Sequence, residues 1–311
     1  MDSGIDKKIE GKRLLIFLFL SFGLTWIIFA AAIMKGMKWD GFDYAMEQFV
    51  GLGMLMPFGA NLLTRMITKE GFPLTGKDSL MLGIRFNHKM WKYYLFALLI
   101  PWICIELGNV LKILVCSKAY DKELFQTAGL DKGITYVYPL IAINSAAILS
   151  FAALGEEEGW RGYMMPKLIH LLGMKKALIA GGVIWGLWHV PLTCIGHNFG
   201  TGYPGFPYVG ILLMCVMCTL MGILLTFVTV RTNSIWPAAI MHAVNNASPS
   251  ILRFYINDEV LEGNLPNPIL SFVFMWIPLA IIDGIILYRM KKNRDFTDSD
   301  PHSLPVKNDD K

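Results

Sequence analysis

The stretch Gly155-Glu156-Glu157-Glu158-Gly159-Trp160-Arg161-Gly162 decides the fold that this sequence is expected to adopt. It places three carboxylates in a row at the end of an uncharged apolar run, residues 136–155. Acidic side chains are costly at membrane depth and usually face a water-filled interior in which they have a function. The stretch therefore predicts a membrane helix whose end contributes to a polar site inside a helical bundle.

The composition supports the same interpretation. Hydrophobic residues make up 54% of the 311 positions and charged residues 17%, with a mean hydropathy of +0.48. A soluble domain of this length would be less apolar, so the predicted fold class is all-α, a polytopic membrane bundle in contact with the lipid bilayer. The net charge of +4 is small, and no nucleic-acid partner is expected. Five cysteines without metal-binding spacing are interpreted as free thiols rather than a disulfide framework.

Eight apolar runs are candidates for crossing the hydrocarbon of a bilayer, which takes about 20 residues. The first is longer than the apolar region of a secretory signal, about 7–15 residues, and is therefore expected to be a span. The predicted spans are residues 14–34, 46–64, 93–111, 136–155, 176–195, 208–230, 235–251 and 268–288, the seventh being short. They are expected to form one transmembrane domain (1–290, motif-bearing core about 135–250), followed by a disordered cytoplasmic tail (291–311).

The loops differ in their content of Lys and Arg. Residues 7–13, 65–92 and 289–294 are rich in both, whereas residues 196–207 contain neither. Cytoplasmic loops of membrane proteins carry an excess of these residues. We therefore expect a multi-pass protein of the cell membrane with both termini in the cytoplasm.

Helical geometry assigns different roles to the acids of the first motif. Glu157 and Arg161 are four residues apart with the acid first, the favourable order for an ion pair on one helix face. This pair is expected to give structural support. Glu156 is rotated by about 100° from Glu157 and is left free for chemistry. Glu158 is expected to turn towards the headgroups or solvent.

Two later apolar runs carry polar residues at the same spacing of four: Trp185 with His189, and His242 with Asn246. An acid in an apolar pocket can act as general base to a water. One imidazole can orient that water, and the other can donate to a developing oxyanion together with the Asn246 amide. These residues are therefore interpreted as a set of groups that can catalyse peptide hydrolysis. Two alternatives remain open: interhelical hydrogen bonding and a proton or ion pathway.

Three motifs in this order carry a resemblance to a known family: Glu156-Glu157-x-x-x-Arg161, Trp185-x-x-x-His189 and His242-x-x-x-Asn246. Over about residues 135–250 the chain resembles the CPBP intramembrane proteases, the group of CaaX-processing and bacteriocin-processing proteases that includes the type II CaaX prenyl protease. The resemblance implies a helical bundle with an intramembrane cavity. It also implies that Glu156 and His189 activate water, and that His242 and Asn246 form the oxyanion site. Trp185 stands where the family frequently has Phe.

The expected function is thus an intramembrane endopeptidase acting on a peptide or membrane-protein substrate. The alternatives are a non-catalytic bacteriocin-immunity or scaffold protein and a proton-coupled transporter. A metal-free mechanism is favoured because the H-E-x-x-H helix of common zinc proteases is absent. Glu156, His189 and His242 would be the ligands if zinc is bound. Cys194, five residues after His189, is a weaker candidate nucleophile.

Convergence of these residues requires an irregular fold. Counted along straight helices at about 1.5 Å per residue, Glu156 lies near the cytoplasmic end of its span, whereas His189 lies deep in the next one. The two can meet if the fourth helix continues past Arg161, or if the fifth breaks near Pro191. The sequence does not choose between these. Gly181, Gly182 and Gly186 predict a face for close helix packing on the fifth span.

Overall fold

A computed structural model describes residues 3–36, 44–76, 78–124, 132–247 and 250–292. These residues form helices, with one isolated bridge between Tyr120 and Ile256 and no strand among them. The elements in chain order are α1 (Ser3–Met34), α2 (Tyr44–Thr68), α3 (Trp91–Val115), η1 (Ser117–Ala119), α5 (Lys132–Glu157), η2 (Glu158–Met164), α6 (Met165–Leu172), α7 (Met174–Trp188), α8 (Val190–Thr193), α9 (Tyr208–Thr232), α10 (Trp236–Ala247), η3 (Leu252–Tyr255), α11 (Asp258–Gly263), η4 (Pro268–Phe272) and α12 (Val273–Lys292). The predicted all-α polytopic bundle is confirmed, whereas the tail predicted to be disordered lies mostly outside the described residues.

Helices long and apolar enough to cross a membrane number six among the described residues. They are Asp6–Met34, Gln48–Thr68, Trp91–Val115, Tyr136–Leu172, Tyr208–Thr232 and Pro268–Lys291. The other two predicted spans form the shorter helices α7, with 15 residues, and α10, with 12. At about 1.5 Å per residue neither covers the roughly 30 Å of a hydrocarbon core. The count of eight spans therefore stays a prediction.

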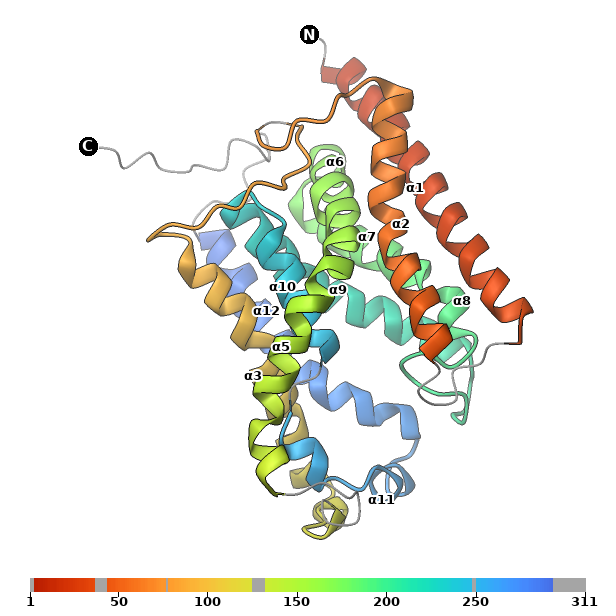
Figure 1. Ribbon diagram of the computed structural model, residues 1–311, viewed down its shortest axis with the longest axis vertical. Coiled ribbons are helices and arrows are strands. Elements are labelled where there is room, and N and C mark those ends of the chain that lie inside the picture. Colours follow the sequence, from red (N-terminus) through yellow and green to blue (C-terminus); the bar gives the residue numbers. More distant parts are fainter. Residues whose placement is uncertain (1–2, 37–43, 77, 125–131, 248–249, 293–311) are drawn as a thin grey trace.

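The structure contains both of the irregularities that could bring Glu156 and His189 together. α5, η2 and α6 follow one another without a break, so the helix that carries Glu156 continues past Arg161 (Figure 1). The middle part, η2, is π-helical: the Met165 N–H donates to the Trp160 carbonyl, five residues back. Short π-helical segments are rare and frequently occur at functional sites. In addition α7 ends at Trp188, and Pro191 lies in the first turn of the short α8.

Glycines allow the helices around η2 to approach closely. A Cβ atom on Gly159 would collide with the backbone of Pro57 in α2, and one on Gly155 would crowd the backbone of Leu55. These two glycines therefore let α2 pack against α5 and η2. On the opposite side, Gly182 and Gly186 of α7 lie directly against the backbone of α9. The predicted close packing is confirmed at Gly182 and Gly186, whereas Gly181 lies against the Met165 side chain of α6.

Aromatic side chains fill the core beside η2. The rings of Phe17 and Trp160 lie 5.7 Å apart, those of Trp160 and Trp188 5.9 Å, and those of Trp188 and Phe29 5.9 Å, all in edge arrangements. The four side chains are fully buried. They fix the end of α7 against α1 and η2, and His189 follows directly after this end.

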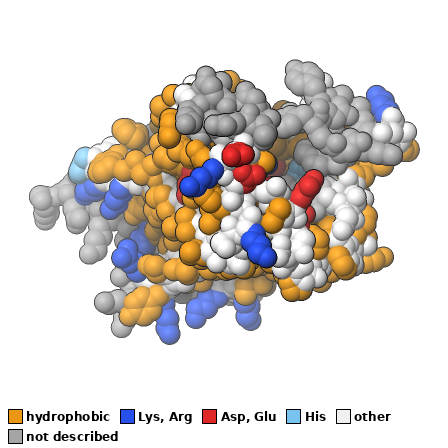
Figure 2. Space-filling model, turned by 90° about the horizontal axis from the view of Figure 1, so that it is seen from below, with side chains coloured by type: hydrophobic (Ala, Val, Ile, Leu, Met, Phe, Trp, Pro, Cys, Tyr) orange, Lys and Arg blue, Asp and Glu red, His pale blue; other side chains and the backbone are white. Residues whose placement is uncertain are grey.

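The surface divides by polarity. Large hydrophobic side chains such as Phe19, Ile27 and Leu114 are exposed on the flanks, as expected for helices that face lipid. Figure 2 shows the end of the bundle at which α11 lies, where acidic and basic side chains stand close together with hydrophobic side chains around them. α11 contributes the exposed Asp258 and Glu259 to the described surface.

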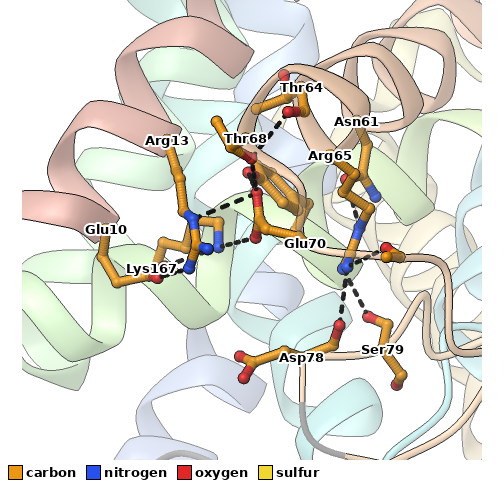
Figure 3. A network of polar contacts seen from close by, with 12 residues as sticks. Glu10, Arg13, Asn61, Thr64, Arg65, Thr68, Glu70, Asp78, Ser79 and Lys167 are labelled. Carbon is orange, nitrogen blue, oxygen red and sulfur yellow. Dashed lines mark hydrogen bonds and ion pairs between the residues drawn. The ribbon is translucent and has the colours of Figure 1, made fainter. Parts of the chain in front are cut away.

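A partly buried group of charges, here called the Glu70 network, joins α1, α2 and α6 (Figure 3). The Glu70 carboxylate accepts from Thr68 Oγ1 at 2.5 Å, Tyr163 Oη at 2.7 Å and Lys167 Nζ at 3.1 Å. Lys167 also pairs with Glu10 at 2.7 Å, and Glu10 pairs with Arg13. Burial alone would raise the pKa of Glu70, but the hydrogen bonds and the Lys167 charge outweigh it and hold the pKa below its ordinary value.

Candidate functional site

Trp185 of α7 contacts four of the other site residues predicted from the sequence. Its Nε1–H donates to Glu156 Oε2 at 2.9 Å. Its ring lies 5.8 Å from the ring of His189 and 5.4 Å from that of His242. The guanidinium of Arg161 stacks over the same ring at 4.1 Å. One side chain therefore contacts groups from η2, α5, α7 and α10. We call Glu156, Glu157, Arg161, Trp185, His189 and His242 the site cluster.

The backbone at the end of α7 determines how His189 is oriented. Its Nδ1 lies 2.8 Å from the Trp185 carbonyl oxygen. A carbonyl can only accept, so Nδ1 carries the proton and Nε2 of the neutral ring is an acceptor. The helix end is held from α1, because Trp26 Nε1 donates to the Trp188 carbonyl at 3.0 Å. His189 thus presents a lone pair from a fixed position, as a residue that orients water requires.

Glu157 joins the first motif to the third. One oxygen, Oε1, accepts from Arg161 at 3.1 Å and lies 2.8 Å from Nδ1 of His242. The predicted Glu157–Arg161 pair is present and fully buried. The contact with His242 was not predicted, and it gives Glu157 a second role: it orients the imidazole that α10 contributes. The described residues supply no hydrogen-bond partner for the other oxygen, Oε2.

Glu156 stands apart from these charge pairs, as its place on the helix predicted. It is 2% exposed, and its hydrogen bond to Trp185 is its contact with the rest of the cluster. A carboxylate with a single neutral donor retains lone pairs for a water molecule. The arrangement therefore suits Glu156 to the part of a general base.

The expectation that Glu158 faces headgroups or solvent was wrong. Its side chain is 1% exposed, and Oε1 accepts from Asn61 Nδ2 of α2 at 2.6 Å. The cause is η2: the chain passes from α- to π-helical geometry at Glu158, and the close approach of α2 at Gly159 encloses the side chain. The three consecutive acids consequently contact three different helices.

Asn246 lies one helical turn after His242 on α10 but outside the cluster. Its side chain is exposed, and its oxygen accepts a long hydrogen bond of 3.4 Å from Asn245. Residues four apart on a helix have Cβ atoms about 5–6 Å apart. Asn246 is therefore a neighbour of the site cluster on the same face of α10, and its role in an oxyanion site stays a prediction.

The cysteine alternative gains no geometric support. Cys194 is exposed after the end of α8. The thiol recorded beside His189 is that of Cys218 on α9, with Sγ 3.9 Å from Nδ1. Since Nδ1 already donates to the Trp185 carbonyl at 2.8 Å, it is not placed to accept a proton from this thiol.

Zinc is the metal for which the sequence offers a ligand set, Glu156, His189 and His242. Over the described part of the chain, no group of three or more His, Cys, Asp and Glu side chains is placed to hold a metal ion. The set named for this purpose, Glu156, His189 and His242, is gathered around the indole of Trp185 rather than around a common point. These side chains do not fit a zinc centre as they are arranged.

The fold and the site define a class, a polytopic helical membrane protein with a buried cluster of acids and imidazoles. Residues 138–248 match the family described as Rce1-like, type II CAAX prenyl endopeptidase. The chain is also 30% identical over 119 residues to CAAX prenyl protease 2 of Methanococcus maripaludis, a match that covers 37% of this chain. The chain spans less than half (43%) of the length of that relative. Both matches support the CPBP/CaaX protease family, which confirms the resemblance drawn from the motifs.

Proposed function

We propose that this protein is an intramembrane endopeptidase of the CAAX type, in which Glu156 activates a water molecule. The observation that carries the proposal is the position of Trp185, which brings Glu156 and both imidazoles around one indole. The family match supports peptide-bond hydrolysis as the reaction. The proposed setting is the cell membrane, with both chain termini in the cytoplasm.

The water-activating pair would be Glu156 and His189. Both present acceptors, the free lone pairs of the Glu156 carboxylate and Nε2 of His189. A water that donates one O–H to each has its oxygen lone pair turned away from both, towards the carbonyl carbon of a peptide. A general base at this position contributes about 10²–10⁴-fold to a rate.

The oxyanion would be bound by His242 and Asn246. Nδ1 of His242 faces the Glu157 carboxylate at 2.8 Å, and this negative charge stabilises an imidazolium. In that form Nε2–H is a donor for the carbonyl oxygen as it becomes negative. Glu156 and Glu157 then balance Arg161 and the His242 imidazolium, so the cluster carries no net charge. The Asn246 amide would add a second donor from the next turn of α10.

The proton follows a closed path. Glu156 accepts it from water as the water oxygen bonds to the carbonyl carbon. Glu156 then gives it to the amide nitrogen as the carbon–nitrogen bond breaks. The products are a carboxylic acid and an amine, and the Glu156 carboxylate is restored. No cofactor is required, and we propose that none is used.

The substrate class is tested with internally quenched peptides that end in a CaaX sequence, one farnesylated and one not. The purified protein in detergent is expected to cleave at least one of them. Glu156→Gln, which preserves shape but not basicity, should lower the rate by about 10³-fold. Failure of the wild type on both peptides, or full activity of Glu156→Gln, would contradict the proposal. The second outcome would favour a scaffold or immunity role.

The metal-free part of the proposal has a separate test. A chelator such as 1,10-phenanthroline is added to the purified wild type, and cleavage is measured before and after. The rate is expected to stay unchanged. If the chelator abolished cleavage and added Zn²⁺ restored it, the water would be activated by a metal ion, and the metal-free proposal would be contradicted.

A further inference from the structure

The helix that carries His242 is short, and its beginning is held by a segment from outside the helical core. This segment, here called the strap, comprises residues 71–76 and 78–82 of the connection between α2 and α3. The Ile235 N–H donates to the Met81 carbonyl at 3.1 Å, and Trp236 Nε1 donates to the Leu82 carbonyl at 2.9 Å. Both donors lie at the start of α10. The strap therefore contacts α10 at its first turn.

The strap in turn is held by Arg65 of α2 (Figure 3). Nη1 of Arg65 donates to the carbonyls of Asp78 at 2.8 Å and Gly71 at 3.2 Å, and Nη2 donates to that of Ser79 at 3.0 Å. Arg65 is 2% exposed. The planar guanidinium offers its donors in a fixed fork, so it fixes both arms of the strap relative to α2.

Asn61 connects Arg65 to Glu158, the first residue of η2. Its Oδ1 accepts from Arg65 Nε at 2.9 Å, and its Nδ2 donates to Glu158 Oε1 at 2.6 Å. Because the two ends of the amide have different partners, its orientation is determined. Glu158 is the direct neighbour in sequence of Glu157, which contacts His242.

These contacts form a closed circuit. From Glu158 it runs through Asn61, Arg65, the strap and α10 to His242, and from His242 through Glu157 back to Glu158. We propose that Asn61 and Arg65 are positioning residues, which set the position of His242 against Glu157 by holding the strap on the first turn of α10. The inference rests on the proposed function for its kinetic readout.

The physical reason is the length of α10. A helix of 12 residues does not cross the bilayer, so the lipid does not fix it along its axis as it fixes a full span. Misplacing a catalytic group by about 1 Å can cost about 100-fold in rate. Arg65→Gln and Asn61→Leu remove links of the circuit without contacting the site cluster, and each is expected to lower kcat by about 10–100-fold with little change in KM.

A matched control lies on the same helix between these residues. Thr64 is fully buried, and its hydroxyl donates to the Ala60 carbonyl within α2 at 2.7 Å. Thr64→Val removes a buried hydrogen bond of α2 without contacting the strap. It should leave kcat unchanged even where it lowers the melting temperature, and this separates positioning from stability.

Hydrogen exchange followed by mass spectrometry tests the inference without any substrate. Amides of residues 235–247 should exchange about fivefold faster in Arg65→Gln and Asn61→Leu, the effect of losing one hydrogen bond. Thr64→Val should leave them unchanged. Exchange of residues 235–247 at the wild-type rate in both strap variants would overturn the inference, even if the protein is an active protease. Inactivity of the wild type would instead count against the proposed function alone.

A double variant tests whether the links act in series. Trp236→Phe keeps the ring and removes the hydrogen bond to the Leu82 carbonyl, so it loosens the strap at its other end. If the circuit is continuous, breaking it at a second point should add nothing. The double variant Asn61→Leu, Trp236→Phe should then have the same kcat, and the same amide exchange rate in α10, as the more strongly affected single variant. Multiplied losses would show two independent effects and would contradict the circuit. Trp236→Phe also provides the test if Asn61→Leu fails to fold.

Discussion

The buried site cluster and the partly buried Glu70 network are both groups of acids and bases, yet their acids differ in how far their hydrogen-bonding capacity is used. Both oxygens of Glu70 have donors, from Thr68, Tyr163 and Lys167. In the site cluster Glu157 Oε2 has no partner among the described residues, and Glu156 accepts from one neutral donor. Each histidine uses one ring nitrogen in a hydrogen bond.

The difference has a physical meaning. A buried polar group without its full set of hydrogen-bond partners costs free energy. Unpaired buried donors and acceptors therefore call for an explanation, and a catalytic role is one. Both oxygens of Glu70 are paired, and the network joins α1, α2 and α6, which is sufficient to explain it. The site cluster keeps acceptors open around Trp185. We therefore attribute a stabilising role to the Glu70 network, and the open acceptors of the site cluster suit the proposed chemistry.

After Glu156, the largest effect that separates the regions is expected at His242. His242→Ala removes the proposed oxyanion donor and should lower kcat by about 10²–10³-fold. His170→Ala is the matched control, because His170 lies on α6 beside Asp6 at 3.3 Å and outside the site cluster. Peptide cleavage by the two variants is compared. Equal activities would remove His242 from the chemistry.

A smaller effect distinguishes two neighbouring acids. Glu157→Gln removes the charge that faces both Arg161 and His242, and should lower kcat by about 10–100-fold, the value of a hydrogen bond to a charged group. Glu158→Gln retains an acceptor oxygen for Asn61 and should change kcat by less than about threefold. The ratio of the two rates is the measurement. A larger loss in Glu158→Gln would contradict the different roles given to these acids.

Trp185→Phe should have a milder effect. An aromatic ring remains beside both imidazoles, and only the hydrogen bond from Nε1 to Glu156 is lost. A decrease in kcat of about tenfold is expected from one hydrogen bond to a carboxylate. Trp102→Phe, which loses the bond from Nε1 to Glu106 Oε1 at 3.3 Å on α3, is the control and should keep its activity. A decrease as large as that of His242→Ala would show that the indole does more than orient Glu156.

The smallest effect on activity is expected for Glu70→Gln, which should change stability instead. The pKa of Glu70 is lowered in the folded protein, so its contribution is present above the unfolded pKa, about 4.3, and is lost as pH falls through the lower folded value. The melting temperature of the variant in detergent should lie below that of the wild type at pH 7. The difference should shrink below about pH 4. A difference that stays constant with pH would show that the charge is not responsible.

Much of the architecture followed from the sequence because its determinants are local. The apolar runs predicted the long helices, and the spacing of four predicted the Glu157–Arg161 pair and the close packing at Gly182 and Gly186. The separate position of Glu156 followed from helical rotation. These features depend on residues within a few positions of one another, which periodicity can detect.

The features of the structure that the sequence does not predict depend on contacts between segments far apart in the chain. Arg65 was counted as a loop cation, although it is buried and binds three backbone carbonyls of the strap. Asn61 and Arg65 are four residues apart at the end of an apolar run, which is a weak signal by itself. The burial of Glu158 depends on the π-helical geometry of η2 and on the approach of α2. Nothing in the local pattern indicates either one.

The central claim is that Glu156 and His189 hold one water molecule, and kinetics of a double variant test it most directly. Glu156→Gln alone should lower the rate of peptide cleavage by about 10³-fold and His189→Ala by about 10²-fold. If both residues act on the same water, the combined variant should fall to about the level of Glu156→Gln, because groups that act as a unit are not additive. A product of the two losses, about 10⁵-fold, would show that they act in separate steps and would contradict the account.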